Sequence, residues 1–309
     1  MTMDWTSFIR RQDASNTLRF IPQRTAMPAM PELRANISFL RCTHGLTCRI
    51  VHRVAFELGP ITVHWYGVLV AAGFLAGIWT ASRRGIRDGI TPETIIDLGP
   101  WLIIGALLGA RAWYVASYWQ QDFAGRPVWA IFNMRQGGLV FYGGLVGASL
   151  GYILYARLKK LPLWKVADVL APSIALGQSF GRVGCLMTGC CYGRPTDLPW
   201  AIRFPLDHQT LGNPVHPTQI YESLLNLCLY LFLAWLYRRK KFDGQIFATY
   251  LICYAVLRSF VEFFRGDYPR YYGGLATPAH FVSVAILATG LVLWWRLGTR
   301  GAKGQVSNP

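Results

Sequence analysis

The sequence contains few charged residues, and acidic residues are the scarcest among them. Charged residues make up 15% of the 309 positions, with 15 Asp and Glu against 31 Lys and Arg, whereas 53% are hydrophobic. Soluble globular domains carry about 25% charged residues. This shortage of charge argues against an ordinary soluble domain and indicates a membrane protein.

Long polar segments are also missing between the apolar stretches, which predicts a single membrane domain. A helix of roughly 20 apolar residues spans a hydrocarbon core of about 30 Å. The stretches that are long enough lie at about 61–82, 95–118, 136–157, 166–189, 217–237, 244–264 and 278–296. We therefore expect an all-α integral membrane protein with seven transmembrane helices, a membrane domain over residues 54–297 and a tail over residues 298–309.

Positive charge gathers in short clusters beside the predicted spans. The clusters contain Arg83, Arg84 and Arg87; Arg157, Lys159, Lys160 and Lys165; Arg238, Arg239, Lys240 and Lys241; and Arg296, Arg300 and Lys303. All fall on one side of a seven-span chain, which the positive-inside rule makes cytoplasmic. The N-terminus is then outside, the C-terminus is cytoplasmic, and residues 190–216 form an external loop. Topology and lipid headgroups explain the net charge of +16, so we expect membrane lipids and no nucleic acid as partners.

Residues 1–53 lack a hydrophobic region of signal-peptide type, although the topology places them outside. They contain eight Arg, no Lys and three acidic residues, and these arginines would have to cross the membrane. We expect much of this stretch to be an upstream extension of the reading frame, with a working start near Val51. A disordered arm is the alternative that the composition leaves open.

Charged residues are rare inside the predicted spans, where each costs roughly 2.5 to 3.5 kcal/mol on insertion scales. The four that stand out are Arg111, Arg182, Arg258 and Glu262, and all lie in the outward half of their span. Tyr254, Arg258 and Glu262 are spaced by four residues, so they share one helix face. One interpretation is an Arg258–Glu262 ion pair that locks the bundle. The other is that two guanidinium groups converge on a phosphate, for which a phospholipid headgroup is the nearest source.

The spans that start outside open with polar and aromatic residues. These are His64, Trp65 and Tyr66; Arg135, Gln136 and Tyr142; and His216, Gln219, Tyr221 and Glu222. A single interfacial Trp or Tyr is more often part of an aromatic belt than of a site. Together with the buried charges, these residues indicate one outward-facing cavity built from several helices.

Conventional metal-binding spacings are absent among the cysteines. Cys185, Cys190 and Cys191 follow the pattern C-x4-C-C, which is not a usual zinc spacing, so we expect no metal. A disulfide from Cys185 to Cys190 or Cys191 is the main alternative role. A nucleophilic cysteine is disfavoured, because no base stands at a motif-defined position beside these thiols.

Small residues recur at every fourth position of three spans. They are Gly105 and Gly109; Gly143, Gly147 and Gly151; and Gly177 and Gly181. Lipid gives helices no hydrophobic reason to associate, so such faces serve close backbone packing. We expect these three spans to approach their neighbours closely.

Five blocks of sequence occur in order along the chain. They read HWYG in span one, GGLVFYGGLVG in span three, GRVGCLMTGCCYGR in span four, HPTQIYE in span five and YAVLRSFVEFFRGD in span six. In this order and spacing they resemble the prolipoprotein diacylglyceryl transferase family. The resemblance covers roughly residues 54–297.

The resemblance implies that the diacylglyceryl group of phosphatidylglycerol moves to the lipobox cysteine thiol of a prolipoprotein signal peptide. A thioether forms and glycerol phosphate is released. It also implies a multi-pass enzyme of the bacterial inner membrane, with its active site towards the periplasm and without a metal or cofactor. The alternatives are a family paralogue with another lipid or thiol substrate, and an anion transporter, in which polar residues should continue into the inward halves of the spans.

The resemblance maps the two phosphate-binding arginines of the family to Arg182 and Arg258. The other functional positions that it carries over are Tyr66, Gly193, Tyr254 and Glu262, with His216, Gln219 and Glu222. Arg111 is added as a further substrate-binding candidate. Arg182 and Arg258 would stabilise the negative charge that grows on the leaving phosphate. Tyr142, His216 and Glu262 are the candidate bases, and bulk solvent is the alternative proton acceptor.

Two blocks depart from the better-known family pattern. Tyr142 stands where histidine is common, and Cys185 and Cys190 stand where asparagine and glutamate are common. A mechanism that needs a base at these positions is therefore in doubt for this chain.

Overall fold

The structure, a computed structural model, describes residues 53–58, 61–133, 137–267 and 277–306. The expectation of an N-terminal extension concerns residues that lie outside these ranges, except for Arg53. Arg135 and Gln136 lie outside them as well.

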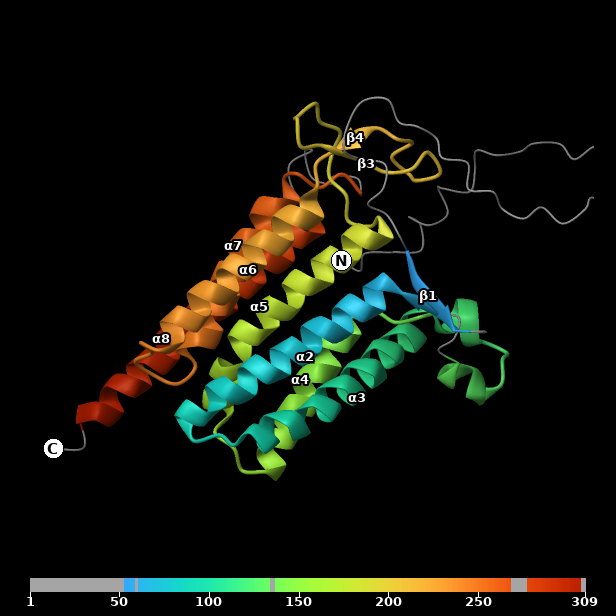
Figure 1. Ribbon diagram of the computed structural model, residues 1–309. Coiled ribbons are helices and arrows are strands. Elements are labelled where there is room, and N and C mark those ends of the chain that lie inside the picture. Colours follow the sequence, from blue (N-terminus) through green and yellow to red (C-terminus); the bar gives the residue numbers. More distant parts are fainter. Residues whose placement is uncertain (1–52, 59–60, 134–136, 268–276, 307–309) are drawn as a thin grey trace, which may run out of the picture. The chain divides into compact units, whose positions relative to one another are not determined.

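Seven long helices make up most of the described chain (Figure 1). They are α2 (Trp65–Gly85), α3 (Pro92–Ser117), α4 (Phe141–Leu158), α5 (Leu163–Thr188), α6 (Thr218–Tyr237), α7 (Gln245–Glu262) and α8 (Pro278–Val306). Three short helical turns, η1 (Ile86–Asp88), η2 (Trp119–Phe123) and η3 (Val128–Phe132), lie between them. The long helices correspond one to one with the predicted apolar stretches, so the mostly helical fold is confirmed.

Four of these helices, α2, α3, α6 and α8, are long and apolar enough to cross a membrane. In the described chain the other three long helices are less apolar. Helix α5 carries Lys165, Asp168 and Arg182, helix α7 carries Arg258 and Glu262, and α4 is rich in glycine and tyrosine. The chain is therefore a multi-pass membrane protein.

The distribution of exposed and buried side chains also suits a membrane. Trp79, Leu108 and Leu145 are each more than half exposed on the helix surfaces, whereas Glu222 and Glu262 are at most 4% exposed. In water this arrangement would leave large apolar areas uncovered. In lipid it is favourable, because charged groups find partners only inside the bundle.

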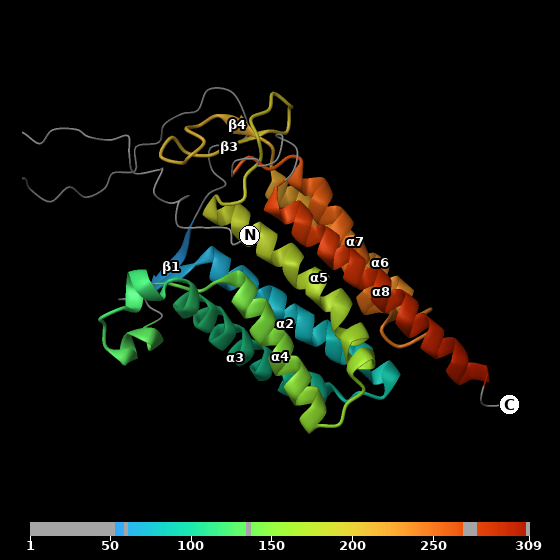
Figure 2. The ribbon, with the colours of Figure 1, turned by 180° about the vertical axis from the view of Figure 1, so that it is seen from behind.

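Helix α5 is the central helix of the described chain. It packs along α2 on one side and along α6 and α7 on the other, while α3 pairs with α4 and α7 with α8 (Figures 1 and 2). This position brings residues near the C-terminal end of α5 close to α2, α6 and α7 together.

The predicted glycine packing is present between α3 and α4. A Cβ atom added to Gly109 would lie 2.3 Å from the carbonyl oxygen of Gly143, and one added to Gly105 would lie 2.5 Å from that of Gly147. The expectation is wrong for Gly181, which has no neighbouring atom within 4 Å of an added Cβ. Its helix instead approaches α2 at Gly73, where an added Cβ would meet Phe180 at 2.8 Å.

Four short strands are present that the all-α expectation did not include. Strands β1 (Val54–Leu58) and β2 (Ile61–His64) form an antiparallel pair before α2. Strands β3 (Ile202–Arg203) and β4 (Pro214–Val215) pair within the connection at 190–216. Phe204 and Val215 are buried there against Leu186 of α5, so this connection is a folded segment seated on the end of α5.

Candidate active site

The first part of the candidate site is an ion pair between α5 and α6. Arg182 lies near the C-terminal end of α5, and its Nη2 is 2.8 Å from Oε1 of Glu222, in the second turn of α6. The glutamate is almost fully buried, which the paired guanidinium makes tolerable. Among the described residues, Glu222 is the carboxylate that pairs with Arg182. The remaining donors of this guanidinium are available to a ligand.

The second part is an ion pair within α7. Arg258 Nη1 lies 2.6 Å from Oε2 of Glu262, one turn further along the helix. Thr277, just before α8, donates its hydroxyl to the other carboxylate oxygen of Glu262 at 2.7 Å. Glu262 thus holds Arg258 in one orientation and ties the end of α7 to the start of α8.

Tyr254 connects the two arginines. Its hydroxyl lies within electrostatic reach of Arg182, Arg258 and Glu222, and of Tyr142 at the start of α4. The spacing of Tyr254, Arg258 and Glu262 predicted a column on one helix face. The structure adds that Tyr254 lies within electrostatic reach of Arg182 of α5, so two guanidinium groups from different helices influence the same tyrosine.

Tyr66 approaches the same region from α2. Its ring packs against Gly184, where an added Cβ would lie 3.0 Å from Cδ2 of the tyrosine. It also lies within electrostatic reach of Arg182 and Cys185. A side chain at position 184 would push Tyr66 away, which explains why the residue after the GRV segment is glycine.

Gly193 and His216 join the connection at 190–216 to the helix ends. The backbone N–H of Gly193 donates to the carbonyl of His216 at 3.0 Å, and an added Cβ would lie 2.5 Å from Cβ of His216. The N–H of the next residue, Arg194, donates to the carbonyl of Phe264 at 2.9 Å. Two backbone segments therefore approach closely at Gly193. The packing of the loop explains why this position is a glycine.

His216 lies beside this junction, and its imidazole ring can take part in acid–base chemistry. Its Nδ1 lies 3.3 Å from the hydroxyl of Tyr221, which accepts a hydrogen bond from Trp200 Nε1 at 2.7 Å. Burial lowers the pKa of His216 from its usual value of 6.5. The imidazole is thus neutral at neutral pH and able to accept a proton.

Gln219 has a different environment from the one expected for a ligand-binding residue. It is 1% exposed, and its Nε2 donates to the carbonyl of Cys190 at 2.7 Å. Thr218 beside it donates to the carbonyl of Cys191 at 2.7 Å. The first turn of α6 therefore holds the turn that follows α5.

Arg111 lies apart from these residues. Its guanidinium donates to five backbone carbonyls, those of Ala130, Ile131, Asn133, Gly137 and Gly138, at 2.6 to 3.1 Å. It also lies over the rings of Tyr114 and Phe123. A guanidinium has five N–H donors, so all of them are used. Arg111 holds the segment between α3 and α4, and it has no donor left for a phosphate.

Asp168 is a buried charge that the sequence analysis missed. It is completely buried in α5 and accepts hydrogen bonds from the backbone N–H groups of Gly244 at 2.8 Å and Phe247 at 3.0 Å. It therefore caps the N-terminus of α7. An acidic residue within an otherwise apolar run was the available signal. Its role is structural, because it lies at the opposite end of α5 from Arg182.

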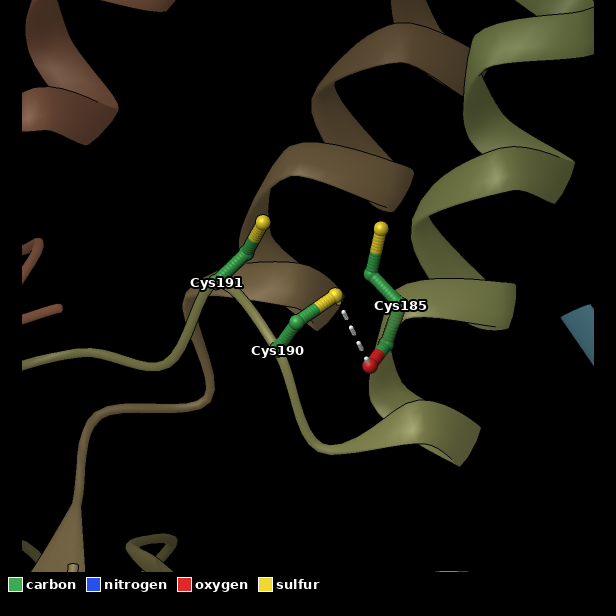
Figure 3. A group of neighbouring side chains, drawn as sticks. All are labelled: Cys185, Cys190 and Cys191. Atoms are coloured by element: carbon green, nitrogen blue, oxygen red, sulfur yellow. Dashed lines mark hydrogen bonds between the residues drawn. The ribbon is translucent and has the colours of Figure 1, made fainter. Parts of the chain in front are cut away.

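The three cysteines after Arg182 come together. Their Sγ atoms lie within 4.8 Å of one another, and all three are free thiols (Figure 3). The alternative of a disulfide from Cys185 is therefore not formed in the structure. No other cluster of potential metal ligands occurs among the residues that the structure describes.

A family model described as prolipoprotein diacylglyceryl transferase matches residues 53–296. The chain belongs to the prolipoprotein diacylglyceryl transferase family. The match includes α2 to α7 and most of α8, and with them all of the candidate site residues.

Curated relatives with the name phosphatidylglycerol–prolipoprotein diacylglyceryl transferase are similar over most of this transferase-family chain. One from Synechococcus elongatus is 39% identical over 264 residues, covering 82% of this chain and 90% of the relative. One from Finegoldia magna is 38% identical over 242 residues, covering 78% and 94%. One from Geobacillus kaustophilus is 38% identical over 264 residues, covering 84% and 96%.

Proposed function

We propose that the protein transfers the diacylglyceryl group of phosphatidylglycerol to the lipobox cysteine of prolipoproteins. The observation that carries this proposal is the placement of Arg182 and Arg258. They come from different helices, border one polar region through Tyr254, and lie in a chain whose outer surface is apolar. Guanidinium groups in this arrangement suit the phosphate of a lipid whose acyl chains stay in the membrane.

Each arginine has a task in this reaction that follows from its contacts. Glu222 orients Arg182 and Glu262 orients Arg258, so both guanidinium groups are positioned before the lipid binds. As the bond between the glyceryl carbon and the phosphate oxygen breaks, negative charge grows on the phosphate. Fixed donors stabilise this charge more in a water-poor site than they would in water.

The acceptor thiol must lose its proton, and three residues are candidates for receiving it. Glu262 already binds Arg258 through one carboxylate oxygen and Thr277 through the other, so both oxygens are engaged. Tyr142, at the exposed start of α4, lies within electrostatic reach of Tyr254. His216 is neutral because burial lowers its pKa, so it is the candidate whose protonation state suits the role at neutral pH. Tyr66, Tyr254, Gly193, Gln219 and Glu222 would shape the pocket around the lipid headgroup.

The proposed function includes a topology. All seven long helices would span the bacterial inner membrane, with the N-terminus outside, the C-terminus cytoplasmic and the active site towards the periplasm. Residues 54–297 would form the transferase domain and residues 298–309 a cytoplasmic tail. The basic clusters between helices and the position of the 190–216 segment at the opposite helix ends support this arrangement.

The proposal is tested with the purified full-length protein, labelled phosphatidylglycerol and a lipobox peptide. Mass spectrometry should show a gain of one diacylglyceryl unit on the peptide, and a peptide with serine in place of cysteine should stay unmodified. Arg182→Ala or Arg258→Ala should lower the turnover at least about 100-fold, as loss of a donor to a developing anion does. Arg203→Ala is the matched control, because Arg203 is an exposed arginine of β3. Near-normal turnover in either active-site variant would contradict the phosphate role.

A further inference from the structure

An apolar groove runs along the exposed side of helices α3 and α4, which lie side by side over most of their length (Figure 2). It consists of two hollows of about 510 and 590 Å³. Both hollows are lined by Gly109 and Ala112 of α3 and by Gly147 and Leu150 of α4, so they form one continuous groove. None of the residues that line it is charged.

Glycines explain why the groove is open. Gly105, Gly109 and Gly147 bring the two backbones so close that no side chain fits between them, and all three residues line the groove. Leu108 and Leu150 border it and are 59% and 61% exposed. Small residues of this kind allow a further helix to approach a backbone closely in the membrane.

The length of the groove limits what it can hold. Along α3 it extends from Pro100 to Ser117, which corresponds to about 25 Å at 1.5 Å per residue. The apolar h-region of a signal peptide has about 7 to 15 residues, or roughly 10 to 23 Å as a helix. A complete transmembrane helix of about 20 residues is longer than the groove. An h-region therefore fits inside it.

Two acidic residues precede the inner end of the groove. Glu93, Asp97 and Trp101 are spaced by four residues, so they share the face of α3 that lines the groove. Both carboxylates are exposed, and neither forms an ion pair with a residue that the structure describes, Arg157 at the end of α4 included. Asp97 also lies within electrostatic reach of Tyr155 of α4, so its charge acts on both helices. These carboxylates suit the positively charged n-region with which a signal peptide begins.

The outer end of the groove lies beside the candidate active site. It is bordered by Trp113 and Ser117 of α3 and by Gly143 of α4. Gly143 directly follows Tyr142, which lies within electrostatic reach of Tyr254. A chain that leaves the groove at this end therefore arrives at the tyrosine that both site arginines influence.

We propose that the α3–α4 groove binds the h-region of the prolipoprotein signal peptide, with the n-region at Glu93 and Asp97 and the lipobox at the outer end. This inference rests on the proposed function and its topology. A signal peptide keeps its positive end in the cytoplasm, and its cleavage region follows the h-region. The peptide therefore runs parallel to α3, and its lipobox cysteine reaches the neighbourhood of Tyr142.

The same charges argue against two other occupants. An anionic phospholipid of the inner leaflet with a chain in the groove would place its phosphate beside Glu93 and Asp97, and like charges repel. A second copy of the chain bound through the same face would bring two such pairs of carboxylates together. A positively charged n-region is the partner whose charge these residues complement.

Photo-crosslinking shows directly which molecule occupies the groove. The full-length protein carries benzoylphenylalanine in place of Leu108 or Leu150, in vesicles of phosphatidylglycerol and phosphatidylethanolamine. It is irradiated with a prolipoprotein whose lipobox cysteine is serine, and mass spectrometry identifies the products. We expect crosslinks to the h-region from both positions and none from Val284, which is 63% exposed on α8. Crosslinks from both groove positions to lipid alone, or to a second copy of the chain, would overturn the proposal.

Kinetics test whether the groove serves the acceptor substrate. Ala112→Trp fills the groove where its two hollows meet and should raise the KM for the prolipoprotein at least about fivefold, because the h-region loses its place of close packing. The KM for phosphatidylglycerol should stay the same. Ala288→Trp, at an exposed position of α8, is the matched control. Thermal unfolding checks that each variant is folded, and an unchanged prolipoprotein KM in folded Ala112→Trp would overturn the proposal.

A charge exchange tests the inner end. Glu93→Lys combined with Asp97→Lys should raise the KM for the prolipoprotein at least about fivefold, because attraction of the n-region becomes repulsion. A prolipoprotein with glutamates in its n-region should restore the KM, which a merely structural effect of the two substitutions would not do. Asp243→Lys changes the charge of another exposed acid, between α6 and α7, and should leave the KM unchanged. Failure of the exchanged substrate to restore the KM would overturn the role of the two acids.

The outcomes separate this inference from the proposed function. Crosslinks to the h-region in a protein that transfers no diacylglyceryl group would contradict the proposed function and leave the groove as a signal-peptide site. Full transfer by a protein whose groove positions crosslink only to lipid would overturn the groove and leave the proposed function standing.

Discussion

Arg111, Arg182 and Arg258 are all arginines within apolar helices, but their partners give them different roles. Arg111 donates to backbone carbonyls alone, and these belong to the segment between α3 and α4. Arg182 and Arg258 each face a carboxylate and border the same tyrosine. The carbonyls around Arg111 use its charge to fix a loop, whereas the carboxylates of Glu222 and Glu262 orient Arg182 and Arg258.

Arg111→Lys should therefore lower stability and spare lipid binding. A lysine has three donors on one nitrogen and cannot reach carbonyls on both sides of the guanidinium plane, and hydrogen bonds to charged groups contribute about 1.5 to 3 kcal/mol each. We expect a lower unfolding temperature in detergent and a KM for phosphatidylglycerol within about twofold of the wild type. A large rise in KM with unchanged stability would show instead that Arg111 contacts the lipid.

The lowered pKa of His216 predicts how the activity of the enzyme changes at low pH. Because burial lowers its pKa from the usual 6.5, the ring stays neutral through neutral pH and becomes charged only at a lower pH. If it accepts the thiol proton, kcat should fall as the pH drops through that lowered pKa. His216→Gln should lower kcat and remove this acidic limb from the pH profile. If the His216→Gln variant keeps the acidic limb of the pH profile, another group accepts the thiol proton.

At the scale of elements, the glycines of α3 and α4 set how closely two helices approach. Carbonyl oxygens of one helix occupy the space in which the other would place its Cβ atoms. This geometry leaves no room for any side chain larger than hydrogen at Gly109 and Gly147.

Gly109→Ala and Gly147→Ala should each lower stability by about 1 to 3 kcal/mol, the range for overpacking. Gly181→Ala is the matched control, because an added Cβ there meets no atom within 4 Å and alanine favours the helix by about 1 kcal/mol. The comparison is made by thermal unfolding in one detergent. Equal stability of the Gly109 and Gly181 variants would contradict the close packing.

Helix α5 connects the two ends of the bundle. At one end Asp168 caps α7, and at the other Arg182 pairs with Glu222 of α6. Asp168 is fully buried and Arg182 is partly buried, and each fixes a neighbouring helix. Because α5 carries polar residues at both ends for these contacts, it is less apolar than α2, α3, α6 and α8.

At the scale of the molecule, the seven-span topology makes a prediction about reporters. Alkaline phosphatase inserted after the exposed Asp207 should be active, because the 190–216 segment would lie in the periplasm. The same enzyme inserted after Lys241, between α6 and α7, should be inactive, and a fluorescent protein fused after residue 309 should fluoresce in the cytoplasm. The opposite pattern at Asp207 and Lys241 would invert the proposed orientation.

Much of this structure follows from local sequence. Apolar runs alone locate the seven helices to within about five residues at most of their ends. The fourfold spacing of Tyr254, Arg258 and Glu262 predicts their shared face, because a helix places such residues side by side. The order of the five sequence blocks leads to the family, and the family match confirms it.

The remaining features depend on partners that are distant along the chain, so only the tertiary structure decides them. The Arg182–Glu222 pair requires α5 and α6 to pack in one register, and the five carbonyls around Arg111 come from a segment that folds back onto α3. The meeting of Cys185, Cys190 and Cys191 also depends on α6, because the pattern C-x4-C-C does not reveal that Thr218 and Gln219 hold the turn after α5. Local periodicity determines which residues share a face, whereas long-range packing determines what that face meets.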